Sequence, residues 1–138
     1  MSKKAGRDTG KLVDDWLEMA YDAIEVAHLC YAHKHFLFAA HTCQQGIEKA
    51  LKAALQNDGI VPPHTHNLDK LAQKCGIWGL LTIEQQKFLV LLSGLYISAK
   101  YPNVKAAKSR NLTEKTIERF LGDSREVLSL ICRHVRKL

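Results

Sequence analysis

The chain has few of the residues that interrupt regular structure or build cross-linked proteins. Its 138 residues include three prolines, eight glycines and four cysteines, too few for a linker array, a collagen-like repeat or a disulfide scaffold. Cys30, Cys43, Cys75 and Cys132 stand far apart and form no CxxC pair, so we expect no zinc or other metal site. We therefore expect reduced thiols in a cytoplasmic protein, and no cofactor.

Signatures of secretion, membrane insertion and several common enzyme classes are also absent. The N-terminal MSKKAGRDTGK is followed by an acidic stretch, and the apolar run at 88–99 is too short to span a bilayer. No GxxxxGK[ST], GxGxxG, GxSxG or HExxH pattern occurs. The length and the apolar share of 46% fit one globular domain over residues 1–138.

The net charge of +6 is concentrated at one end of the sequence. Residues 1–99 hold ten Lys and Arg against ten Asp and Glu, whereas residues 100–138 hold ten against four. A basic final third favours an acidic partner such as a nucleotide, RNA or an acidic protein surface. The alternative is a solvated helix face that keeps the protein soluble.

Apolar residues recur at helical spacing along most of the chain. The pattern predicts long helices at about 8–31, 34–57, 83–100 and 113–136 and a short one at 68–74. No strand-length alternation of β-branched residues occurs. The sequence therefore predicts an all-α fold, an up-and-down antiparallel bundle of four long helices plus one short helix.

Residues typical of helix ends support these limits. Thr82 and Thr113 are placed to cap the last two helices, and Thr65 or Asn67 is placed to cap the short one. Pro62 and Pro63 exclude helix in the loop VPPHTH that precedes the short helix. Tyr101-Pro102 is expected to end the fourth long helix, and 103–112 to form a loop.

The helix predicted at 83–100 is apolar on almost every side along FLVLLSGLY. Such a helix must be covered on more than one face, and a second copy of the chain can supply the cover, so we expect a symmetric homodimer. The alternative is that the short helix and the 101–112 loop cover this face within one monomer.

Polar residues line the apolar stripe of the second helix. At 100° per residue, His41, Gln44, Glu48 and Lys52 lie within about 60° of Leu37. One interpretation is a pocket wall that presents amide, carboxylate, imidazole and ammonium groups to a ligand. The other is a satisfied network between helices, in which Gln44 or Glu48 bonds a tyrosine or arginine of another helix.

A second cluster lies at the end of the fourth helix. Tyr96 and Lys100 share a face, and Tyr101 follows. A tyrosine beside a lysine can stack a base and hold a phosphate, although an ordinary helix end explains the lysine equally well. His66 is expected to cap the short helix or bond locally at its start, and Cys43 to be a buried thiol that points away from the polar side chains of the second helix.

Three segments resemble the HEPN family, a nucleotide-binding domain of prokaryotes and higher eukaryotes. They are AHTCQQGIEKALKAAL (40–55), PPHTHNLDKLAQKCG (62–76) and YISAKYP (96–102). The resemblance implies a bundle of four to five helices, commonly dimeric, that binds nucleotides or RNA, often beside a separately encoded minimal nucleotidyltransferase. Many members are ribonucleases with an Arg followed five to seven positions later by a His, and no arginine of this chain has a His in that window.

These observations predict a non-catalytic nucleotide- or RNA-binding module. Gln44, Gln45, Glu48 and Lys52 would line one wall of its site, and the rim would consist of Tyr96, Lys100 and Tyr101. Two alternatives stay open: a toxin-type ribonuclease with a degenerate active site, and a purely structural dimerisation module.

Overall fold

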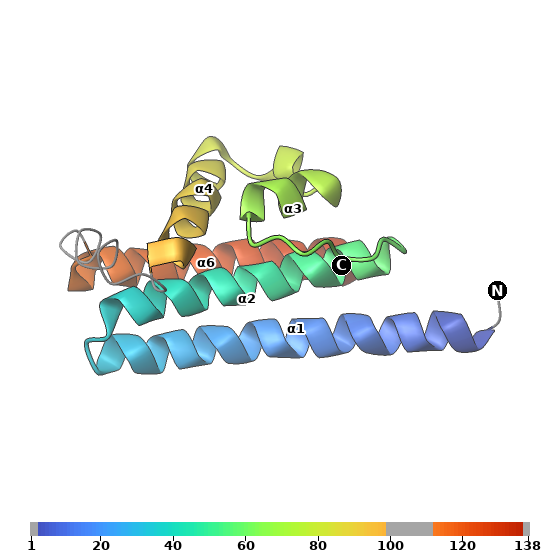
Figure 1. Ribbon diagram of the computed structural model, residues 1–138, viewed down its shortest axis with the longest axis horizontal. Helices are drawn as coiled ribbons and strands as arrows, with labels where there is room; N and C mark the ends of the chain where they lie inside the picture. Colours follow the sequence, from blue (N-terminus) through green and yellow to red (C-terminus); the bar gives the residue numbers. More distant parts are fainter. Residues whose placement is uncertain (1–2, 99–111, 137–138) are drawn as a thin grey trace.

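Three long helices lie side by side, and a fourth packs at an angle against two of them (Figure 1). The computed structural model describes residues 3–98 and 112–136. These form α1 (Lys3–Ala32), α2 (Phe36–Asn57), α3 (Leu68–Lys74), α4 (Ile83–Ser98) and α6 (Glu114–Arg136), with a 3-10 turn at Trp78–Leu80. No strand occurs in these ranges, and the predicted all-α fold of four long helices and a short one is confirmed.

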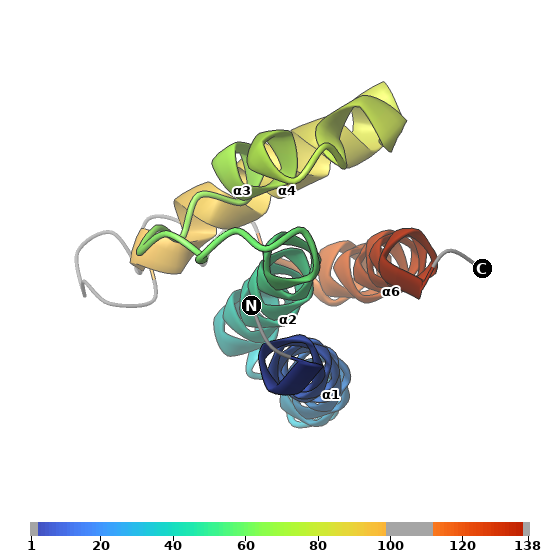
Figure 2. The same ribbon diagram turned by 90° about the vertical axis from the view of Figure 1, so that its right-hand side faces the viewer.

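Helix α2 is the centre of the molecule. Figure 2 shows α1, α6 and the α3–α4 pair arranged around it. Thirteen of its residues are buried, many of them alanines, which let neighbouring helices approach closely. At Gly46 a Cβ atom would lie 2.8 Å from Cδ1 of Ile24 and 3.1 Å from the carbonyl oxygen of Ala20. A Cβ here would force the Ile24 side chain and the Ala20 backbone to shift, so the close crossing of α1 and α2 favours glycine at this position.

The predicted caps of α4 and α6 are confirmed. The Gln85 amide donates to Oγ1 of Thr82 (3.1 Å) and the Thr82 amide donates to Oε1 of Gln85 (2.9 Å), which is a capping box. The Thr116 amide donates to Oγ1 of Thr113 at 3.2 Å.

The cap expected for α3 is wrong. Asn67 makes no side-chain cap bond, and Thr65 accepts only from the Asn67 amide, before the helix begins. The first helical amide, that of Leu68, donates instead to Oγ of Ser93 on α4 (2.9 Å). A cap supplied by another helix leaves no local sequence pattern.

Helix α4 has one covered face and one open face. Leu89 and Leu92 are fully buried, whereas the side chains of Ile83, Val90 and Leu91 are 69%, 53% and 49% exposed. Helix α3 therefore covers only part of α4 and leaves the face with Ile83, Val90 and Leu91 exposed. The 101–112 loop of the monomer alternative falls in the part that the structure does not describe, except for Leu112.

One predicted helix end differs from the structure and another is not tested. Helix α1 begins at Lys3 rather than near residue 8. The prediction missed its first turns because the buried apolar stripe that marks the helix starts only at Val13. The predicted end of the fourth helix near residue 100 lies outside the described residues.

Within the described ranges, no helix combines the length and the apolar character needed to cross a membrane.

Candidate functional site

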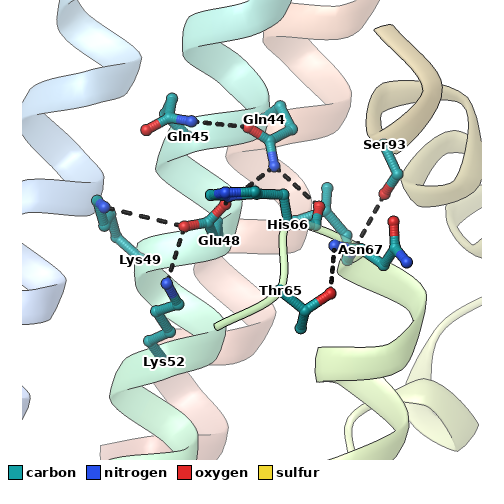
Figure 3. Close-up of polar contacts among 10 residues, drawn as sticks. Gln44, Gln45, Glu48, Lys49, Lys52, Thr65, His66, Asn67 and Ser93 are labelled. Carbon is teal, nitrogen blue, oxygen red and sulfur yellow. Dashed lines mark hydrogen bonds and ion pairs between the residues drawn. The ribbon is translucent and has the colours of Figure 1, made fainter. Parts of the chain in front are cut away.

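Gln44 and Glu48 lie in the interior, where α2 faces the segment that leads into α3. They stand one turn apart on α2, and their exposed fractions are 0% and 1%. Both side chains point toward His66 (Figure 3). The helical spacing in the sequence predicted this inward orientation, because both residues fall beside the apolar stripe that packs against the core.

The Glu48 carboxylate is saturated with donors. Its Oε1 lies 2.8 Å from Nδ1 of His66 and accepts from Nε2 of Gln44 at 3.1 Å. Its Oε2 accepts from Nζ of Lys52 at 3.0 Å and lies 3.9 Å from Nζ of Lys49. Burial alone would raise the pKa of Glu48, but the bonds from His66, Lys52 and Gln44 outweigh it and hold this pKa below its ordinary value. The group is therefore a carboxylate at neutral pH.

The amide of Gln44 ties the loop to the helix. Its Nε2 also donates to the carbonyl oxygen of His66 at 3.1 Å, and its Oε1 accepts from Nε2 of Gln45 at 3.0 Å. The polar groups of the network thus satisfy one another. The satisfied network that the sequence left open is present, but its partners are His66 and lysines of α2 rather than a tyrosine or arginine of another helix.

A cationic edge adjoins this network. The ammonium groups of Lys49 and Lys52 lie 5.5 and 5.8 Å from the ring centroid of Trp16 on α1, close enough for cation–π attraction. Their side chains are only 22% and 14% exposed. Glu48 balances one of these two charges, so one positive charge remains. We call Trp16, Glu48, Lys49, Lys52 and His66 the Glu48 patch.

The structure unites one of the two predicted clusters. Gln44, Gln45, Glu48 and Lys52 are joined by hydrogen bonds. Tyr96 lies within α4, but its side chain is not among those described, and Lys100 and Tyr101 lie outside the described residues.

Sequence reasoning missed three members of the patch. It singled out neither Trp16 nor Lys49, and it expected His66 to cap the short helix or bond locally at its start, whereas the His66 ring contacts Glu48 eighteen positions away. The residues of the PPHTH segment predicted no contact with the second helix, since a contact between distant segments has no period in a single sequence.

The remaining candidates behave as structural groups. Cys43 is fully buried, and burial, with a smaller contribution from Cys30, raises the pKa of its thiol to about 11, which suppresses nucleophilic reactivity. In the described part of the chain, no group of three or more His, Cys, Asp or Glu residues is placed to hold a metal ion.

Comparison with known proteins places this arrangement in a family. Two solved structures share the fold. TT1696 from Thermus thermophilus is 21% identical, with a TM-score of 0.75 over 88% of this chain and 96% of that one. ST0689, an archaeal HEPN homologue, is 23% identical, with a TM-score of 0.68 over 89% and 97%. No curated protein matches. The model of the HEPN domain matches residues 13–135, and the chain therefore belongs to the HEPN family.

Proposed function

We propose that this protein is a non-catalytic module that binds a nucleotide or RNA through the Glu48 patch. The observation that carries the proposal is the pair of partly buried lysine side chains, Lys49 and Lys52, whose ammonium groups share the Glu48 carboxylate. One positive charge is left over beside an indole ring. A phosphate and a base are the groups that such a combination recognises. Membership of the HEPN family supports the same assignment.

In this proposal the residues of the network have different roles. Gln44 and Glu48 are too buried to touch a ligand, so they act as positioning residues that fix Lys52 and His66. Lys49, Lys52 and Gln45 meet phosphate or base, with Tyr96, Lys100 and Tyr101 as the proposed rim. In the same proposal, the protein presents the bound nucleotide to a separately encoded nucleotidyltransferase.

Calorimetry with ATP, GTP and NAD tests this proposal. Lys52→Met keeps the aliphatic stem beside Trp16 and removes the charge, and we expect affinity to fall about tenfold or more, as for the loss of one charged hydrogen bond. Lys70→Met removes the same charge from the exposed surface of α3 and should leave affinity unchanged. Absence of binding to the wild type, or equal binding by both variants, contradicts the proposal.

A second candidate function, dimerisation, is favoured by the open face of α4. Trp78, Ile83, Val90 and Leu91 line a mostly apolar groove of about 560 Å³, and exposed apolar patches of this kind mark interaction surfaces. We propose a second copy of the chain as its occupant. Sedimentation should show a dimer that Val90→Lys converts to monomer, whereas Val26→Lys, an exposed apolar position on α1, leaves it intact. A monomeric wild type contradicts this second proposal.

The enzymatic alternative is a ribonuclease with a degenerate site. Arg133 and His134 are adjacent and exposed on α6, which is not the spacing that the ribonuclease members use. Incubation of the pure protein with tRNA and mRNA should leave both intact. Cleavage that is lost in His134→Ala would replace the non-catalytic proposal.

A further inference from the structure

A second groove, separate from the Glu48 patch, runs between α1 and α6. Its volume is about 360 Å³. Its floor contains the buried side chains of Ile24 and Leu128. His28 on α1 and Arg125 on α6 face each other across it. No residue that lines this groove takes part in the network around Glu48.

The contact between His28 and Arg125 fixes the state of the imidazole. Nη2 of Arg125 donates to Nε2 of His28, because a guanidinium has no acceptor atom. The Nε2 atom therefore carries a lone pair, and the ring is neutral with its proton on Nδ1. Burial and the neighbouring Arg125 both lower the pKa of His28, which is consistent with this state at neutral pH.

The charge of Arg125 is not neutralised by this contact. A guanidinium is always protonated, and a neutral imidazole cancels none of its charge. Among residues 3–98 and 112–136, Arg125 forms no ion pair with a carboxylate. Glu25 lines the same groove without reaching it at ion-pair distance. Within the part of the chain that the structure describes, the groove therefore holds an exposed cation with no carboxylate at ion-pair distance.

Two residues with hydroxyl groups, Tyr21 and Ser129, also line this groove. Ser129 stands about one helical turn from Arg125 on α6. The Tyr21 hydroxyl instead bonds Cys132, about two turns from Arg125. Desolvation by burial, with Cys132 next, raises the pKa of Tyr21, so its phenol keeps its proton at neutral pH. A guanidinium fork with a hydroxyl donor one turn away suits the terminal oxygens of a phosphoryl group. The carboxylate of Glu25 repels a bare anion but accepts from the hydroxyl of a sugar.

We propose that the groove between α1 and α6 binds the phosphoryl group of a phosphorylated sugar. Arg125 forms the charged bonds, Ser129 adds a hydroxyl donor, and Glu25 accepts a sugar hydroxyl. When the phosphoryl group takes the Arg125 donors, Nε2 of His28 loses its bond, gains a proton from solvent and donates to the anion. Binding thus protonates His28, with Tyr21, Glu25 and Arg125 as the ionisable groups that line the groove beside it.

Proton NMR of the histidine rings in the full chain tests this proposal. At pH 7, ribose 5-phosphate should shift the His28 ring signals toward those of the protonated form, while the signals of the exposed His64 stay in place. Arg125→Gln should weaken binding at least tenfold, with thermal unfolding unchanged because the residue is exposed. Unmoved His28 signals, or undiminished binding by Arg125→Gln, would overturn the proposal.

Two further arms separate the sources of the ligand and the two sites. A uridine oligomer without terminal phosphates tests the RNA backbone as the source of the phosphoryl group, and ribose 5-phosphate tests a free metabolite. A shift of the His28 signals with either ligand supports phosphoryl binding in this groove. Inorganic phosphate binding as tightly as ribose 5-phosphate would refute the role of Glu25. Lys52→Met must leave the His28 response intact, so failure of the Glu48 patch and failure of this groove give different results.

Discussion

Nδ1 of His66 lies 2.8 Å from Oε1 of Glu48, so a residue just before α3 is fastened to the middle of the central helix. The fully buried Gln44 strengthens the attachment through the carbonyl oxygen of the same histidine. The α3–α4 layer is thereby held in position over α2 by polar contacts as well as by its apolar core. The same contacts set the place of Lys52 at the edge of the site.

Removing the histidine ring should loosen this attachment. His66→Ala takes one partner from a carboxylate that is 1% exposed, and we expect a loss of about 1–2 kcal/mol in the free energy of unfolding. His64→Ala, at an exposed position two residues away, should change it by less than about 0.5 kcal/mol. Urea denaturation measures both. Equal small effects would show that the Glu48–His66 contact does not stabilise the fold.

Stability should depend on the ionisation of Glu48. Because the pKa of this carboxyl is lower in the folded chain than its ordinary value, its contribution to stability is complete above that ordinary value and is lost as the pH falls through the folded pKa. Thermal unfolding between pH 6 and pH 2.5 should therefore show a steeper acid loss for the wild type than for Glu48→Gln. Parallel curves would contradict the assignment.

The crossing of α1 and α2 should not tolerate a methyl group. Gly46→Ala places Cβ against Ile24 and the Ala20 backbone, and we expect a loss of about 1–3 kcal/mol in stability despite the better helix propensity of alanine. Gly122→Ala, where a Cβ meets nothing within 4 Å, should raise stability by about 0.5–1 kcal/mol. Chemical denaturation measures the change in the free energy of unfolding for both variants, and we expect opposite signs. Stabilisation by Gly46→Ala would contradict the close packing described for this position.

The buried thiol should be unreactive until the protein unfolds. With a pKa of about 11, Cys43 is a thiolate in only about one molecule in a thousand at pH 8. Iodoacetamide labelling followed by peptide mass spectrometry should modify the partly exposed Cys132 first and Cys43 only in denaturant. Labelling of both at similar rates in the native protein would contradict the burial described for Cys43.

The fold was predictable because it depends on periodic information. Apolar spacing and local caps predicted all five helices, and Thr82 and Thr113 act as expected. The site was only half predictable. The i and i+4 spacing of Gln44 and Glu48 revealed an inward polar pair, but the contact with His66 and the cap that Ser93 gives to α3 join segments far apart in the sequence. Such contacts depend on how helices pack.

The two tryptophans of the chain offer the most direct test of the Glu48 patch. Trp16 lies beside Lys49 and Lys52, whereas Trp78 belongs to the 3-10 turn ahead of α4. In a titration with ATP, NMR should show the indole N–H signal of Trp16 moving while that of Trp78 stays still, and Lys52→Met should move the midpoint of this shift to about tenfold higher ATP or more. A static Trp16 signal at saturating ATP would contradict nucleotide binding at this patch.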